Sequence, residues 1–197
     1  MTPVLGFSCT LPLWVSDIAD FDRAYKTDSD KMDLAITLGM NNVTQNTGGP
    51  FGAAIFDAES HRLIAPGVNL VVPAFNPTAH AEIVAMAIAG SRLGRFDLGD
   101  GGANPSVLAT SVEPCAMCLG ATPWSGVSSL LVGARDVDAR AIGFDEGTKP
   151  ADWVGVLTSR GISVALDVQR EGAVAVLNTY LTLGRQIYNS DGQAQDA

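Results

Sequence analysis

The sequence predicts an α/β protein with three layers, in which helices cover both faces of a mostly parallel or mixed sheet. Short apolar segments typical of strands alternate with longer segments whose apolar residues recur at helical spacing. Clusters of Gly, Pro, Asn and Asp separate these segments. The chain has 197 residues, of which 47% are hydrophobic and 17% are charged, as expected for one globular domain. Strands and helices that alternate in this way pack as a sheet between helices.

The first elements follow from their boundaries. Asp30 can cap a helix over Lys31–Gln45, whose apolar residues recur every three or four positions. Gly48-Gly49-Pro50 ends this helix, because neither Gly nor Pro continues one readily. A turn then joins two predicted strands, Phe51–Asp57 and Leu63–Val71.

The later elements are predicted from the same signals. In chain order they are a helix at Ala79–Ala89 closed by Gly90, a loop at Arg92–Pro105, a strand at Val107–Ser111, a helix at Cys115–Trp124, a strand at Ser129–Val132, a helix at Ala151–Ser159, a strand at Ile162–Val168 and a helix at Gly172–Leu183.

Residues 1–29 are predicted to form an N-terminal extension, helical in part around Ser16–Tyr25, and residues 30–197 to form the main domain. No apolar run approaches the ~18 residues of a membrane helix. The N-terminus lacks the basic start of a secretory signal, so we expect no membrane partner and a cytoplasmic location.

The charge of the chain argues against a nucleic-acid partner. Twelve Lys and Arg residues against 21 Asp and Glu residues give a net charge of −9. Binding a polyanion requires basic side chains that neutralise phosphates. A small, uncharged substrate is the better expectation.

Two short motifs carry the chemistry: His80-Ala81-Glu82, and Pro114 to Cys118 with the pattern Pro-Cys-x-x-Cys. His80, Cys115 and Cys118 can bind one zinc ion per chain and leave its fourth position to water, as catalytic zinc sites do. Zinc lowers the pKa of such a water to about 7. Both motifs fall at predicted helix N-termini, where the dipole stabilises thiolates. We expect His80 and Glu82 to point in different directions, so that Glu82 moves protons while His80 binds metal.

A purely structural zinc site is the main alternative. Cys-x-x-Cys alone also occurs in redox motifs and closed zinc sites. A closed site would need a fourth protein ligand, which Cys9 or His61 would supply in an interaction module without catalysis. That alternative explains neither Glu82 nor the proline before Cys115.

His-x-Glu followed by Pro-Cys-x-x-Cys is the signature of zinc-dependent nucleobase deaminases. Between Met32 and Tyr188 the chain resembles the cytidine deaminase superfamily, above all its bacterial guanine deaminase branch. Three blocks support the superfamily: Gly48–Ala53, Asn76–Glu82 and Glu113–Ala121. A fourth block, Gly143–Glu146 with the sequence GFDE, is similar to a segment of the guanine deaminases. The resemblance implies a three-layer α/β/α sandwich with a five-stranded mixed sheet, a zinc site on two helix N-termini, and a homodimer.

The resemblance also implies roles for single residues. Glu82 would shuttle protons. Asn69 would hydrogen-bond the purine, and the backbone at Ala81 would hold the zinc-bound water or the base edge. Glu146, with Asp145 as the second candidate, would receive guanine N–H groups and assist proton transfer. Asn69 could instead only cap a turn, and Glu146 could be a solvated surface acid.

Phe51 and Trp124 are predicted walls for a flat ring, although large aromatic residues also dominate cores. In this family the C-terminal segment can close the active site, sometimes after exchange between subunits, and Tyr188 would belong to such a lid.

The resulting expectation is hydrolysis of guanine to xanthine and ammonia in purine catabolism, by attack of zinc-bound hydroxide on C2. Guanine offers an edge rich in donors, which requires acceptors such as Glu146. Alternatives are deamination of cytosine, adenine, an aminotriazine or tRNA adenosine.

Overall fold

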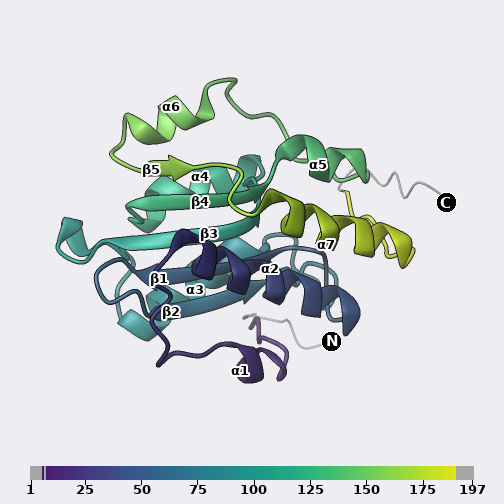
Figure 1. Ribbon diagram of the computed structural model, residues 1–197, viewed down its shortest axis with the longest axis horizontal. Coiled ribbons are helices and arrows are strands. Elements are labelled where there is room, and N and C mark those ends of the chain that lie inside the picture. Colours follow the sequence, from purple (N-terminus) through teal and green to yellow (C-terminus); the bar gives the residue numbers. More distant parts are fainter. Residues whose placement is uncertain (1–5, 7, 190–197) are drawn as a thin grey trace.

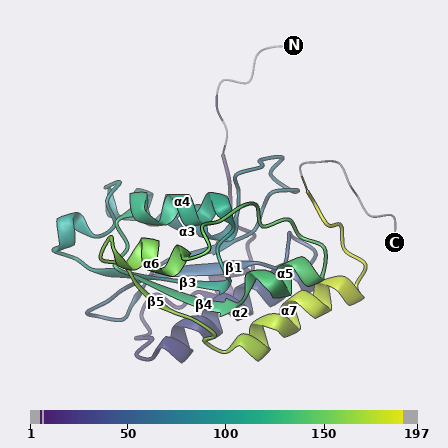
Figure 2. The ribbon, with the colours of Figure 1, turned by 90° about the horizontal axis from the view of Figure 1, so that it is seen from above.

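The computed structural model describes residue 6 and residues 8–189, and it confirms the predicted fold class. Five strands form one sheet in the order β2-β1-β3-β4-β5. Seen along the sheet, α3, α4 and α6 cover one face and α2 and α7 cover the other (Figures 1 and 2). The strands are β1 (Gly52–Asp57), β2 (Leu63–Val68), β3 (Ser106–Val112), β4 (Ser129–Ala134) and β5 (Ser163–Ala165). The helices are α1 (Val15–Ile18), α2 (Asp28–Thr44), α3 (Ala81–Leu93), the 3-10 turn η1 (Asp100–Gly102), α4 (Ala116–Ser125), α5 (Asp136–Ala141), α6 (Trp153–Thr158) and α7 (Arg170–Thr182).

Strand direction brings several chain segments to one edge of the sheet. β1 is antiparallel to both β2 and β3, whereas β3, β4 and β5 are parallel. The start of β1 therefore lies beside the ends of β2, β3 and β4. Ligands of α/β sheets bind outside such strand ends. Phe51, Asn69 and Glu113, the residues next to β1, β2 and β3, consequently gather at this edge.

The helix α3 lies close against β2 because Gly67 has no side chain. A Cβ atom on Gly67 would lie 2.2 Å from the backbone oxygen of Ala81, which begins α3. Any other residue would push the helix away from the sheet. This contact holds the N-terminus of α3 beside the start of β1 and the end of β2.

Several predicted boundaries require correction. Asp30 does not cap α2: Thr27 does, and Asp30 completes a reciprocal capping box with it, so the helix begins at Asp28. α3 continues to Leu93, and η1 lies within the predicted loop. α5 was not predicted; the Asp138 carboxylate caps it by accepting from the backbone N–H of Arg135.

The predicted extension is helical only at Val15–Ile18, less than the expected Ser16–Tyr25. It still packs on the main body, with Val15, Ala19 and Tyr25 buried in the core beside α2. The rings of Tyr25 and Phe56 of β1 lie 5.1 Å apart. The division at residue 29 stays a prediction. Within the described residues, no helix has both the length and the apolar character needed to cross a membrane.

Candidate active site

His80, Cys115 and Cys118 converge on one point although 38 positions separate the first from the last. The His80 Nδ1 atom lies 3.4 Å from Cys115 Sγ and 3.7 Å from Cys118 Sγ. Tetrahedral zinc with ordinary Zn–N and Zn–S bonds would separate such ligand atoms by about 3.6 Å. The donor set and its spacing therefore fit zinc. Among the residues that the structure describes, the cluster contains just these three, so neither Cys9 nor His61 joins it as a fourth ligand.

Two helix N-termini hold the three ligands. His80 is the N-cap of α3 and Cys115 the N-cap of α4, each with extended backbone angles, and Cys118 follows in the first turn of α4. Extended N-caps turn their side chains in front of the helix. A hydrogen bond from Cys118 and a second from His80 lower the pKa of Cys115 to about 4 against the opposing effect of burial. A thiolate, the form that binds metal, is thus favoured there.

Glu82 lies next to this ligand set. Its Oε2 accepts from the Cys118 thiol at 3.4 Å, and its Oε1 accepts from the Thr110 hydroxyl at 3.2 Å. Both His80 and Glu82 line the same cavity, and His80 is the N-cap that precedes α3 instead of a residue of its first turn as expected. Burial, and then the negative charge of Cys115, raise the pKa of Glu82. A buried acid with a raised pKa is suited to proton transfer.

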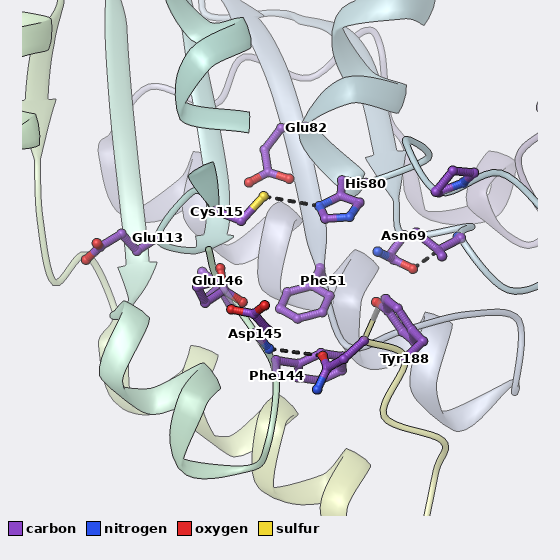
Figure 3. A pocket seen from close by; sticks show the side chains of 14 residues that line it. Phe51, Asn69, His80, Glu82, Glu113, Cys115, Phe144, Asp145, Glu146 and Tyr188 are labelled. Carbon is purple, nitrogen blue, oxygen red and sulfur yellow. Dashed lines mark hydrogen bonds between the residues drawn. The ribbon is translucent and has the colours of Figure 1, made fainter. Parts of the chain in front are cut away.

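A cavity of about 280 Å³ opens in front of these residues (Figure 3). Small-molecule sites usually measure about 300–1,000 Å³, so this cavity suits one compact ring system. Fourteen residues line it: Phe51, Asn69, Val71, Pro77, His80, Glu82, Val112, Glu113, Cys115, Phe144, Asp145, Glu146, Tyr188 and Asn189.

Asn69 lies at the end of β2 and is almost fully buried. Its Oδ1 accepts from the backbone N–H of Val71 at 3.2 Å, so the alternative role in a turn is realised. Its Nδ2 makes no hydrogen bond to any described residue and borders the cavity (Figure 3). Asn69 therefore supports a turn and still has a donor group at the cavity.

The segment 143–149 brings a second carboxylate to the cavity. Glu146 is buried, whereas Asp145 is half-exposed and pairs with Arg140. Burial, then the negative charges of Cys115 and Glu82, raise the pKa of Glu146 to about 8. Of the two candidates, Glu146 alone has the buried, perturbed carboxylate typical of a reacting group. It is not the solvated surface acid of the alternative interpretation.

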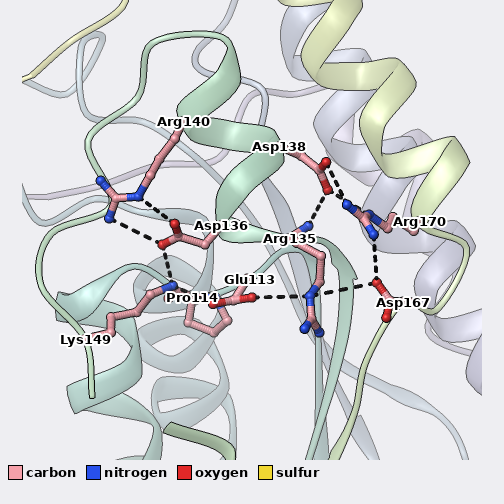
Figure 4. Close-up of polar contacts among 9 residues, drawn as sticks. All are labelled: Glu113, Pro114, Arg135, Asp136, Asp138, Arg140, Lys149, Asp167 and Arg170. Carbon is pink, nitrogen blue, oxygen red and sulfur yellow. Dashed lines mark hydrogen bonds and ion pairs between the residues drawn. The ribbon is translucent and has the colours of Figure 1, made fainter. Parts of the chain in front are cut away.

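The buried side chain of Lys149 binds the residues that precede Cys115 and so holds this segment against them (Figure 4). The Lys149 ammonium donates to Glu113 Oε1 at 2.8 Å and to the backbone oxygen of Pro114 at 3.0 Å. It also pairs with Asp136 at 2.8 Å. The backbone oxygen of Glu146 accepts from Ala116 at the start of α4, at 2.9 Å. Two contacts thus attach the segment to the start of α4: the backbone hydrogen bond of Glu146 and the side-chain bonds of Lys149.

Aromatic rings form one wall of the cavity. Phe51 borders it as predicted, and its ring lies 4.9 Å from that of Phe144, edge to face. Phe144 in turn lies 5.2 Å from Tyr188. The Tyr188 oxygen is buried and has no hydrogen-bond partner within the described part of the chain. The ring of Phe144 was missed although its GFDE segment was singled out, because sequence spacing does not tell which side chain of a loop turns inward.

Trp124 does not border the cavity. It is 83% exposed near the end of α4. Six residues separate it from Cys118, which at about 100° per residue turns it well away from the metal-binding face. The prediction of a Trp124 wall is therefore wrong.

Ala81 lies between His80 and Glu82 with its methyl group fully buried. Its backbone N–H belongs to the first turn of α3, where helices leave donors without intrahelical partners. Its role toward water or base stays a prediction.

Comparison with known proteins agrees with this geometry. The sequence model of the family described as "Cytidine and deoxycytidylate deaminase zinc-binding region" matches residues 25–134. This range is more than half of the chain and includes the three positions 80, 115 and 118 of the ligand cluster. The chain belongs to this deaminase family. The matched residues include the zinc-binding region that gives the family its description, and the zinc expectation is confirmed at that level.

Several family members are similar over long stretches. The guanine deaminase of Bacillus subtilis (strain 168) is 41% identical over 112 residues, which cover 57% of this chain and 67% of that protein. The tRNA-specific adenosine deaminase of Haemophilus influenzae is 36% identical over 94 residues, covering 48% of this chain and 51% of that one. A solved structure of the guanine deaminase from Nitrosomonas europaea is 40% identical with a TM-score of 0.84, covering 92% of this chain and 98% of that one. The structure of NE0047 in complex with 2,6-diaminopurine is 40% identical with a TM-score of 0.86, covering 97% of this deaminase and all of that chain.

Proposed function

We propose that this deaminase hydrolyses the exocyclic amine of free guanine and releases xanthine and ammonia. One observation carries the proposal: a cluster of three metal-binding residues and two buried carboxylates, Glu82 and Glu146, lie around the same cavity. The 40% identity to a solved guanine deaminase, over nearly the whole chain, favours guanine among the possible rings.

His80, Cys115 and Cys118 would hold one zinc ion per chain. With water as a fourth ligand, such an ion would supply Lewis acidity that lowers the pKa of that water to about 7. Glu82, beside Cys118, is placed to pass one proton of the water to the ring nitrogen and the proton of the new hydroxyl group to the departing amine.

The remaining polar groups orient the base. Glu146 receives the N–H groups of the guanine edge, and its raised pKa lets it hold or release a proton near neutral pH. The Asn69 Nδ2 donates to an acceptor of the purine, and the Phe51 ring lies against the flat base. The N–H of Ala81 and the Asp145 carboxylate are secondary contacts of the same edge. Together these groups match a molecule with donors on one side and acceptors on the other.

The size and charge of the site support a free base. A cavity of about 280 Å³ suits a single ring system, and a net charge of −9 opposes a tRNA substrate. The reaction belongs to the cytoplasm, where thiols such as those of Cys115 and Cys118 stay reduced. Exposed aromatic residues such as Phe96 and Trp124 are of the kind that a homodimer buries.

A substrate panel tests the proposal. Purified protein is incubated with guanine, adenine, cytosine, an aminotriazine and tRNA, and ammonia release is measured. We expect rapid release from guanine, with xanthine as the second product. If guanine released negligible ammonia and another compound of the panel released it rapidly, guanine would be excluded as the substrate and that compound would take its place.

A further inference from the structure

We propose that Trp14, in the N-terminal arm formed by residues 8–27, positions the substrate-binding Asn69 through hydrogen bonds by way of Thr47 and Asn42. The proposal deepens the proposed function and rests on it for the role of Asn69. Trp14, Thr47 and Asn42 are positioning residues, since none of them borders the cavity.

Four hydrogen bonds form the connection. The indole N–H of Trp14 donates to Thr47 Oγ1 at 3.1 Å, and the Thr47 hydroxyl donates to Asn42 Oδ1 at 2.8 Å. Asn42 Nδ2 then donates to the backbone oxygens of Gly49 at 2.9 Å and Asn69 at 2.8 Å. These contacts join the arm, the turn after α2 and the end of β2.

The chemistry of each group allows only one direction of donation. An indole N–H cannot accept, so Thr47 accepts from it and directs its own proton to Asn42. The two carbonyl acceptors require the NH₂ side of the Asn42 amide, which leaves its oxygen for Thr47. Asn42 is fully buried, and a lost partner there would leave a polar atom without compensation.

The turn after α2 packs closely against the backbone of Asn69. A Cβ atom on Gly48 would lie 2.0 Å from the Asn69 backbone oxygen and 2.6 Å from Asn42 Nδ2. Only glycine permits this approach. The turn and the Asn69 carbonyl therefore move together.

Asn69 is held at three of its four polar groups. Its backbone N–H donates to Phe51, its backbone oxygen accepts from Asn42, and its Oδ1 accepts from Val71. The remaining group, Nδ2, faces the cavity (Figure 3). The connection from Trp14 therefore sets where this one donor points.

The arm is a firm support for the connection. Val15, directly after Trp14, is buried in the core with Ala19 and Tyr25. The indole is thus held by packing on its own side, and its N–H reaches a turn that lies 33 residues further along the chain. Loss of the N–H alone would free the turn without releasing the arm.

Thr47→Val tests the connection because it keeps the shape of the side chain and removes the hydroxyl. We expect kcat/KM for guanine to fall about fivefold, mostly through KM, since the hydrogen bonds of Thr47 with Trp14 and Asn42 are lost and Asn69 is held less well. Thr47→Ser restores the hydroxyl and should return kcat/KM to within about twofold of the wild type. Trp14→Phe should shift kcat/KM in the same direction as Thr47→Val.

A double-mutant cycle separates positioning from general stability. In an Asn69→Ala background, Thr47→Val should no longer change kcat/KM, because the residue on which it acts is gone. A fall of the same size in that background, or an unchanged kcat/KM in the Thr47→Val variant, would overturn the proposal.

A readout that does not depend on turnover keeps the test separate from the proposed function. Side-chain amide resonances of zinc-loaded, ¹⁵N-labelled protein are recorded, and the Asn69 pair is assigned by its loss in Asn69→Ala. We expect Thr47→Val to shift this pair and Thr47→Ser to leave it in place. If the wild type fails to deaminate guanine, the proposed function fails, and the resonances alone decide: an unshifted Asn69 pair overturns the positioning proposal.

Discussion

At the scale of single residues, Glu82 shows how burial prepares a side chain for chemistry. Its carboxylate lies next to the ligand cluster with 6% of the residue exposed, and the side chains of Thr110 and Cys118 donate to it. Burial raises its pKa, so that holding a proton costs less there than in water. The same residue at the surface would stay ionised and exchange protons only with solvent.

Glu82→Gln should abolish turnover while leaving zinc bound. The amide keeps the shape of the side chain but cannot carry protons, and loss of such a group lowers rates by about 10²–10⁴-fold. The measurement is kcat for guanine together with metal content by elemental analysis. Glu59→Gln, at an exposed position between β1 and β2, is the matched control and should keep wild-type kcat. Near-normal turnover in Glu82→Gln would refute the proton shuttle.

Cys9→Ser should retain both zinc and activity, whereas Cys118→Ser should lose both. Cys9 belongs to the arm and packs against the core as a small apolar side chain, whereas Cys118 is one of the three ligands. Zinc content after gel filtration checks the pair. Loss of zinc from the Cys9→Ser protein would favour a closed, structural site.

At the scale of elements, the segment 143–149 depends on one buried ion cluster. Lys149 and Glu113 each have side chains that are only 7% exposed, and Asp136 of α5 joins them (Figure 4). Removing one partner from such a group leaves an uncompensated buried charge. Glu146 therefore reaches the cavity only while this cluster is intact.

Lys149→Met should lower the free energy of unfolding by about 3–5 kcal/mol. It should also lower kcat/KM, because Glu146 is no longer held against α4. Urea unfolding and steady-state kinetics measure the two effects. Arg23→Met removes a pair with Asp30 at the surface and should cost about 1 kcal/mol or less, without changing kcat/KM. Equal costs for the two variants would mean that the Lys149 cluster does not hold the segment.

Asp138 makes the stability of α5 depend on pH. Its hydrogen bonds with Arg170, and then that with the Arg135 backbone, lower its pKa against the opposing effect of burial. A lowered folded-state pKa adds stability above the unfolded value, about 3.9, and this stability is lost as the pH falls through the folded pKa. Asp138→Asn should therefore destabilise the protein at pH 7, and its difference from the wild type should shrink toward pH 3. Urea unfolding at pH 7, 5 and 3 checks the trend, which a difference independent of pH would contradict.

At the scale of the whole molecule, the metal cluster joins two βα units. His80 is the N-cap of the helix after β2, and Cys115 is the N-cap of the helix after β3, so a metal bound by these ligands would join α3 to α4 at the sheet edge. Zinc held by the three ligands would favour the folded arrangement, in which they lie close together. Its binding free energy therefore adds to the stability of the fold.

Removal of zinc by a chelator should lower the melting temperature and abolish guanine deamination, and added zinc should restore both. Calorimetry and ammonia release measure the two effects, with one zinc per chain at full recovery. An unchanged melting temperature after complete removal would show that the metal does not hold α3 and α4 together.

Local spacing determined the strands, most helices and the metal ligands. Cys115 and Cys118 are recognisable because a Cys-x-x-Cys turn at a helix start brings two ligands together within a few residues, and His80 is recognisable by the His-x-Glu pattern. The strand segments were recognisable by their apolar runs, which depend on burial and not on the partner strand. α5 and the true start of α2 were not recognisable, because a helix cap depends on single side chains and not on a repeating apolar pattern.

The sequence by itself thus determined which residues can bind zinc and which segments build the sheet. Only the tertiary structure decided which other side chains surround that zinc site. It turned Phe144 and Tyr188 inward and Trp124 outward, buried Glu146 rather than Asp145, and connected Trp14 to Asn69. The physical reason is distance along the chain: these contacts join residues tens of positions apart, and their geometry depends on how the sheet, its helices and its loops pack together.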